Sequence, residues 1–234
     1  MRCVGQVEID PFCRRVLAKH WPDVPRWDDV RAFNADSLSE PVDLIAGGFP
    51  CQPTARCGYQ RRQNDDRWLW PEFARIIGEV RPDYVVVENP TGLFDGGIGD
   101  VLRDLAALRI DAEWDCLPAR CAGAPHSRDR LWLVGYSNRL GQPGSIYPRE
   151  LPSPHENDAD DSPLGPVRFA WPPRPSKVDS IPRMADGLSR QVVRTRRKES
   201  HTAIGNAVVP QVAEWVGRRI IEASNKDCSA WHDR

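Results

Sequence analysis

The sequence lacks several features that mark large classes of protein. Its 234 residues include seven cysteines but no CxxC pair, which argues against a zinc site. No apolar run approaches the ~20 residues of a membrane-spanning helix; one of the longest covers only residues 84–87. No basic-then-apolar leader opens the chain. We therefore expect an intracellular protein with free thiols rather than a disulfide frame.

An excess of charge of one sign is also missing. The 32 basic and 33 acidic residues give a net charge of −1, which excludes a strongly cationic coat and confines phosphate binding to local patches. Yet 28 of the 32 basic residues are arginine. Either a GC-rich genome favours arginine codons, or some of these guanidinium groups bind phosphates and guanine edges.

Strand and helix patterns alternate through the first 135 residues. Apolar runs end at polar residues, as buried parallel strands do when a site lies at their carboxyl edge. This alternation of strand and helix patterns therefore predicts an α/β sheet. Strands are expected at 3–9, 42–46, 84–87, 112–117 and 131–134, and helices at 11–20, 70–80 and 100–108.

The composition changes after Tyr136. Residues 141–175 contain nine prolines, and an acidic cluster follows at 156–161, so this stretch is expected to be rich in loops. A basic run at 194–198 precedes a helical pattern at 209–223. We expect a main domain at 1–135, a small proline-rich segment at 136–200, and a segment at 201–234 that returns to the main domain.

A cysteine follows the strand at 42–46, in the turn Gly47-Gly48-Phe49-Pro50-Cys51-Gln52-Pro53. A thiolate in such a loop is a strong nucleophile. The alternative is that Cys51 is a small buried hydrophobic residue, the commonest fate of a free cysteine.

Glu88 ends the next buried strand, where a carboxyl group can share a proton with a bound base. Otherwise Glu88 is an exposed acid at a strand end.

Two arginines precede the strand at 131–134. Arg128 and Arg130 are two residues apart, and on an extended segment such residues face the same way. They can together hold a phosphate and a base carbonyl, or else form a solvated charge cluster with Asp129. Downstream, the stretch Gly-Asn-Ala-Val-Val-Pro at 205–210 leads into the last predicted helix and is, alone, an ordinary turn.

Taken in order, these motifs resemble the cytosine-5 DNA methyltransferase family. The matching stretches are Glu-Ile-Asp-Pro at 8–11, Gly-Gly-Phe-Pro-Cys-Gln at 47–52, Glu-Asn-Pro at 88–90, Arg-Asp-Arg at 128–130 and Gly-Asn-Ala-Val-Val-Pro at 205–210. The resemblance covers about 1–135 and 200–222, and is nearest to the short, phage- or prophage-like type. It implies the Rossmann-like α/β sheet of S-adenosylmethionine-dependent methyltransferases, with a small target-recognition segment.

The resemblance implies covalent catalysis on a cytosine flipped out of double-stranded DNA. Cys51 would add to ring carbon 6, while Glu88 holds ring nitrogen 3 and the amino group. Arg130 would hold the ring carbonyl, and Arg128 would support the cysteine loop or a phosphate. Gln52, next to the nucleophile, is counted with the catalytic residues. Carbon 5 would take the methyl group from S-adenosylmethionine, and no metal is implied.

The resemblance also assigns cofactor contacts. Glu8 would bind the ribose hydroxyls, as acids do in dinucleotide folds, and Ile9 would pack on the adenine. Asp29 would contact the adenine amino group, with Asp28 as its rival. The rest of the pocket would be lined by Pro50, Leu69, Asn206 and Val208.

Arginines supply the expected DNA contacts. They lie in the loop after the nucleophile and in the later basic run: Arg61, Arg62, Arg67, Arg194, Arg196 and Arg197. We expect a monomer that acts on double-stranded DNA, does not bind membranes, and works in the cytoplasm of a bacterial or phage-infected cell within restriction–modification.

The sequence departs from the family at its front. Members begin with a strand and a Phe-x-Gly-x-Gly turn around the cofactor's methionine end, whereas this sequence starts at Met1-Arg2-Cys3-Val4, near the second strand. Without that strand, backbone edges would stay unpaired and the cofactor pocket open. Two explanations stand: a gene start placed at an internal methionine, or a degenerate remnant.

Two other function classes compete. A truncated, inactive remnant would bind DNA or a partner without transferring a methyl group. A cysteine hydrolase would pair Cys51 with one of the five histidines. No motif ties a histidine to Cys51, and a hydrolase would leave Glu88 and the arginine pair without a role.

Overall fold

The computed structural model describes residues 1–50, 68–124, 126–140, 146–147 and 206–230. The chain divides into two compact units. The first unit consists of Met1–Trp114 and Leu131–Gly141, and the second of Asp115–Arg130 and Gln142–Arg234. No helix among the described residues is long and apolar enough to cross a membrane.

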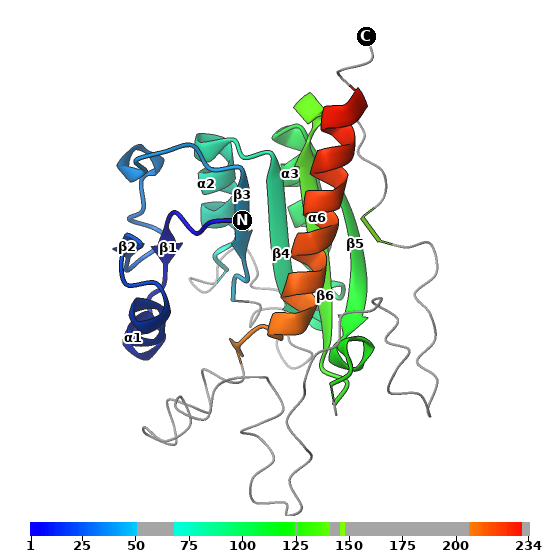
Figure 1. Ribbon diagram of the computed structural model, residues 1–234, viewed down its shortest axis with the longest axis horizontal. Helices are drawn as coiled ribbons and strands as arrows, with labels where there is room; N and C mark the ends of the chain where they lie inside the picture. Colours follow the sequence, from blue (N-terminus) through cyan, green and yellow to red (C-terminus); the bar gives the residue numbers. More distant parts are fainter. Residues whose placement is uncertain (51–67, 125, 141–145, 148–205, 231–234) are drawn as a thin grey trace, which may run out of the picture. The chain divides into compact units, whose positions relative to one another are not determined.

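A four-stranded sheet forms the centre of the fold (Figure 1), in the order β3-β4-β6-β5. Its strands are β3 (Leu44–Gly47), β4 (Tyr84–Pro90), β6 (Asp129–Ser137) and β5 (Ile110–Pro118). β3 and β4 are parallel, and their register pairs Leu44 with Tyr84 and Gly47 with Val87. All four strands were expected, with shifted ends, because β3, β4 and β6 carry runs of apolar residues and β5 alternates between apolar and charged residues.

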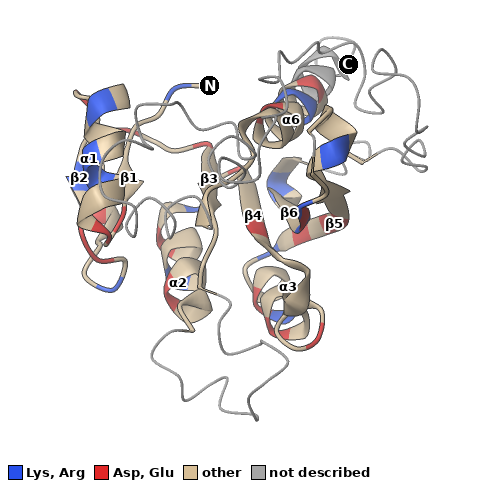
Figure 2. Ribbon diagram, turned by 90° about the horizontal axis from the view of Figure 1, so that it is seen from below, with Lys and Arg blue, Asp and Glu red and all other residues tan. Residues whose placement is uncertain are grey.

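Two helices cover one face of β3 and β4, as Figure 2 shows for α2 (Trp70–Val80) and α3 (Ile98–Ala107). Pro71 opens α2, where its missing N–H is not needed, and Arg81 ends it with a left-handed φ of 52°. The apolar residues of both helices recur at helical spacing and enter one core with the strands. The buried members of this core are Phe49, Trp68, Trp70, Ile77, Val85, Val87, Leu93, Val101, Leu105, Ile110, Leu131 and Leu133.

A smaller layer at the start of the chain holds two strands and a helix. β1 (Gln6–Val7) and β2 (Arg26–Trp27) form a separate parallel pair, linked by α1 (Pro11–His20). The Asp10 carboxylate caps α1 by accepting from the N–H groups of Phe12 and Cys13, at 2.7 and 3.0 Å. Arg75 of α2 donates to the carbonyl of Val30 at 2.9 Å, which ties this layer to the main sheet's helix.

The helix at 11–20 and the helix at 70–80 are confirmed with the expected bounds. The strand expected at 3–9 is shorter, since only Gln6–Val7 pairs with a neighbour. β2 was not expected. Short 3-10 turns complete the described part of this unit at Ala35–Ser37 (η1), Thr91–Leu93 (η4) and Asn138–Leu140 (η6).

The second unit is built around the last helix, α6 (Pro210–Ala230), which extends beyond the expected 209–223. Its buried face carries Val212, Trp215, Val216 and Ile220. This helix contacts the 3-10 turn η5 (Ala119–Ala122). The segment at 146–147 also joins it: Arg219 donates to the Ile146 carbonyl at 2.8 Å, and the Tyr147 and Trp215 ring centroids are 6.2 Å apart.

Candidate active site

The carboxyl ends of β3 and β4 bring two sequence motifs together. Because the strands are parallel and Gly47 pairs with Val87, the next residues, Gly48 and Glu88, lie side by side at the same sheet edge. A Cβ atom placed on Gly48 would lie 2.8 Å from the Glu88 carbonyl oxygen and 3.2 Å from its carboxylate Oε2. Only a glycine allows the chain to pass so close to Glu88.

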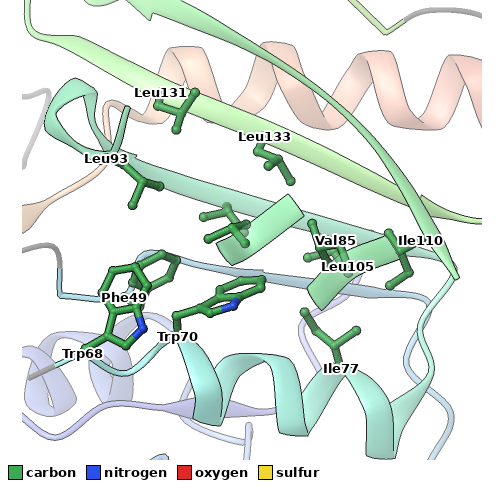
Figure 3. Packing of buried hydrophobic residues seen from close by; sticks show 12 residues of the cluster. Phe49, Trp68, Trp70, Ile77, Val85, Leu93, Leu105, Ile110, Leu131 and Leu133 are labelled. Carbon is green, nitrogen blue, oxygen red and sulfur yellow. The ribbon is translucent and has the colours of Figure 1, made fainter. Parts of the chain in front are cut away.

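An aromatic cluster holds both ends of the segment that follows. Phe49 is buried, and its ring centroid lies 5.2 Å from that of Trp68, edge to face, and 5.4 Å from that of Trp70. Figure 3 shows these three side chains gathered at one end of the core. The Trp70 Nε1–H donates to the Asp104 carboxylate at 2.9 Å. Residues 49 and 68, which flank the stretch containing Cys51, are therefore held next to each other.

Asn89 is a polar side chain of this edge that sequence reasoning did not assign. It is 1 % exposed, and its Nδ2 has no hydrogen-bond partner among the residues that the structure describes. Strand alternation places Asn89 on the same face as Val85 and Val87 of the core, opposite the half-buried Glu88. Its place in the Glu-Asn-Pro motif was the only signal in the sequence.

A second polar edge lies at the carboxyl ends of β1 and β2. Glu8 accepts from the backbone N–H of Asp10 at 2.8 Å, and its own N–H donates to the Trp27 carbonyl at 3.0 Å. Ile9, the next residue, is 64 % exposed. A carboxylate beside an exposed apolar side chain suits a ligand with both hydroxyl groups and a flat apolar ring.

The two rival aspartates after β2 differ in their partners. Asp28 forms an ion pair with Arg14 of α1. Asp29 accepts from the backbone N–H of Arg31 at 2.9 Å and is half-buried. The carboxylate of Asp28 is thus engaged by a neighbouring helix, while Asp29 shapes the turn at the strand end and pairs with Arg31, whose Nη1 lies 3.7 Å from its Oδ1.

The thiols with shifted pKa values in the described part of the chain are poor nucleophiles. Burial, helped by the carboxylates of Glu8 and Asp10, raises the pKa of Cys13 to about 11. Burial likewise raises the pKa of Cys116 and Cys121. These three thiols are therefore protonated at neutral pH.

In the second unit, the stretch before β6 corrects one expectation. Arg128 has a φ of 35°, so it is not part of an extended segment with Arg130, and the premise that both face the same way is wrong. The Arg128 Nη2 donates to the Ala207 carbonyl at 2.6 Å, and Arg130 donates to the Asp129 carbonyl at 2.9 Å. The two guanidinium groups therefore have different partners.

Comparisons with known proteins fit this arrangement. A family model described as C-5 cytosine-specific DNA methylase matches residues 1–191. The chain belongs to this family.

Curated relatives of this chain include Type II methyltransferases of bacteria. Type II methyltransferase M.NgoMIV of Neisseria gonorrhoeae is 30 % identical over 162 residues, which are 63 % of this chain and 51 % of the relative. Type II methyltransferase M.DsaV of Dactylococcopsis salina is 30 % identical over 143 residues, or 59 % of this chain and 40 % of the relative. The chain thus spans about half, or less, of the length of these proteins.

A solved structure supports the fold. Methyltransferase EhMeth of Entamoeba histolytica superposes with a TM-score of 0.58 over 94 % of this chain and 99 % of its own, at 11 % identity. At that identity the likeness concerns the fold alone. The expected α/β methyltransferase fold is confirmed.

The remaining residues assigned by resemblance fall in two groups. Pro50 and Asn206 are exposed, while Leu69 at the start of α2 and Val208 before α6 are half-buried. The others lie outside the described residues: Cys51, Gln52, Arg61, Arg62, Arg67, Arg194, Arg196 and Arg197. The domain boundaries at 135 and 200 likewise stay predictions.

Proposed function

We propose that this chain is a DNA (cytosine-5-)-methyltransferase that acts through a covalent adduct on Cys51. The observation that carries the proposal is the close approach of Gly48 to Glu88. Cys51 follows Gly48 by three residues, a reach of at most ~10 Å, so the edge that presents Glu88 is within range of the nucleophile. A thiolate and a carboxyl at one edge can attack a ring and polarise it at the same time.

The chemistry assigned to these residues starts from a cytosine extruded from the duplex, since the ring faces are covered in the stack. The Cys51 sulfur forms a bond to carbon 6, and the electron pair of the 5,6 double bond shifts to carbon 5 and is delocalised onto ring nitrogen 3. Glu88, hydrogen-bonded to ring nitrogen 3 and the amino group, stabilises that negative charge. Arg130 holds the ring carbonyl.

After methyl transfer, the carbon-5 proton is removed, the bond between sulfur and carbon 6 breaks, and Cys51 is restored. S-adenosylmethionine, when bound, supplies the electrophilic methyl group. The residues at the β1 edge fit its adenosine part, because Glu8 offers a carboxylate for hydroxyl groups and the 64 % exposed Ile9 offers an apolar surface for a base. Asp29 is our choice for the adenine amino group, because it is half-buried at the strand end, whereas Asp28 is exposed.

The rest of the assignment follows the family. Pro50, Leu69, Asn206 and Val208 complete the set of cofactor residues. Gln52 completes the catalytic set, and Arg128 is counted with it as a supporting residue. Six arginines contact DNA phosphates: Arg61, Arg62, Arg67, Arg194, Arg196 and Arg197. The names of the Type II methyltransferase relatives support a partnership with a restriction system. We further propose that the chain is a monomer and works in the cytoplasm.

A second candidate is a chain that binds DNA without transferring a methyl group. It is favoured by one observation: among the described residues, the β1–β2 pair is not hydrogen-bonded to the four-stranded sheet. Methyl transfer needs the cofactor residues beside the β1–β2 pair and Glu88 on the four-stranded sheet, and such a division would weaken their alignment. Calorimetric titration with S-adenosylmethionine separates the candidates; if neither this chain nor a version extended upstream of Met1 binds it, the enzyme proposal fails.

Transfer of labelled methyl groups from S-adenosylmethionine to duplex DNA tests the reaction. We expect Glu88→Gln to lower the rate by ~10²–10³-fold, because one stabilising group for the developing charge is weakened. Asp23→Asn, at an exposed position, serves as the control and should keep the rate. An unchanged rate for Glu88→Gln would remove Glu88 from the mechanism.

A further inference from the structure

Arg128 has a backbone conformation that its local sequence does not explain. Among the described residues, three that are not glycine have a positive φ: Arg81, Arg109 and Arg128. Arg81 and Arg109 follow helices, where left-handed residues are common. Arg128, with a φ of 35°, stands in an irregular stretch before β6. For a residue other than glycine such a conformation is strained and persists only where the surroundings fix it.

The surroundings of Arg128 fix it from two directions. On the backbone side, the Ser127 carbonyl accepts from the Ala119 N–H of η5 at 2.5 Å. On the side-chain side, Arg128 Nη2 donates to the Ala207 carbonyl at 2.6 Å, across 79 residues of sequence. Hydrogen bonds from charged groups are stronger than neutral ones, so this contact can offset the strain.

The carbonyl that Arg128 holds belongs to the segment leading into α6. Val209, two residues further, is buried and accepts from the N–H groups of Val212 and Ala213 at 3.1 Å each. The segment is thus held at Ala207 by Arg128 and at Val209 by the first turn of α6. Val208 stands between these points and Asn206 directly precedes them, and the proposed function assigns both residues to the cofactor.

We propose that Arg128 is a positioning residue for the segment 206–208, and that it acts on cofactor binding rather than on DNA. This inference rests on the proposed function. Arg130, two residues further along the chain, holds the target base, so Arg128 links the strand of the base contact to the segment of the cofactor contact. The rival assignment is a direct contact between Arg128 and a DNA phosphate.

The test compares Arg128→Met, Arg128→Lys and the control Arg120→Met, which removes an exposed arginine of η5. The rate of hydrogen exchange at the amides of Val212 and Ala213 reports how firmly the segment is held, and it needs no ligand. Titrations with S-adenosylmethionine and with duplex DNA at several salt concentrations report the two kinds of binding.

For Arg128→Met we expect exchange at Val212 and Ala213 to rise at least tenfold, with the later turns of α6 unchanged. The dissociation constant for S-adenosylmethionine should rise at least tenfold, while that for DNA stays within twofold. Arg128→Lys should recover part of both effects, because an ammonium group still donates to a carbonyl. Arg120→Met should change neither.

Three results would overturn the inference. If DNA affinity falls with a salt slope reduced by ~1, while exchange and cofactor affinity stay unchanged, Arg128 binds a phosphate. If exchange rises equally along all of α6, Arg128 has only a general structural role. If exchange at Val212 and Ala213 does not change, the link to Ala207 does not hold the segment. If the unchanged chain does not bind S-adenosylmethionine, that result counts against the proposed function. The exchange comparison then still decides whether Arg128 holds the segment 206–208.

Discussion

Replacing Gly48 by alanine tests the geometry of the candidate active site. The added Cβ would lie 2.8 Å from the Glu88 carbonyl oxygen, whereas ordinary contacts begin at 3.4 Å, so the two strands' ends must separate by about 0.6 Å. The obstructing atom belongs to the backbone of β4 and cannot rotate away. Such overpacking typically lowers the free energy of unfolding by about 1–3 kcal/mol.

The effect on catalysis should exceed the effect on stability. A misplacement near 1 Å can slow an enzyme by ~10²-fold, so a shift of about 0.6 Å between the Cys51 turn and Glu88 should slow methyl transfer by about 10- to 100-fold. The control is Gly92→Ala, because a Cβ at Gly92 meets no atom within 4 Å. Urea unfolding gives the stability, and single-turnover methyl transfer at saturating DNA gives the rate. A Gly48→Ala chain with the unchanged rate would refute the close approach of this turn to Glu88.

Three further predictions concern other parts of the chain. Trp70→Phe removes the hydrogen bond to Asp104 and should lower the free energy of unfolding in urea by about 1.5–3 kcal/mol; a change below 0.5 kcal/mol would mean that the bond contributes nothing. Removing the charge of Arg61 or Arg62 should weaken DNA binding and reduce its salt slope by ~1, and an unchanged slope would show that this loop does not touch phosphates. Alkylation of Cys13 should keep accelerating as the pH rises toward about 11, because burial raises its pKa; a plateau near pH 9 would contradict the buried position.

Much of the first unit could be predicted because its signals are local. Pro11 after a capping Asp10 marks the start of α1, and the spacing of Phe73, Ile76 and Ile77 marks the buried face of α2. The meeting of Gly48 and Glu88 also follows from the sequence, since parallel buried strands end at a common edge.

The features that escaped prediction depend on tertiary contacts. β2 is two residues long, and pairing with β1 rather than any pattern makes it a strand. The positive φ of Arg128 could not be predicted, because the residue is not a glycine and the carbonyl that fixes it lies 79 residues away in the sequence. The burial of Asn89 likewise depends on the packing around the sheet edge.

The most direct test of the central claim is covalent trapping. Duplex DNA containing 5-fluorocytosine cannot release the enzyme after methylation, because the fluorine replaces the proton that must leave. In the presence of S-adenosylmethionine, we predict an adduct that survives a denaturing gel for the unchanged chain and for Cys13→Ser, and no adduct for Cys51→Ser. An adduct of undiminished yield with Cys51→Ser would contradict the assignment of Cys51 as the nucleophile.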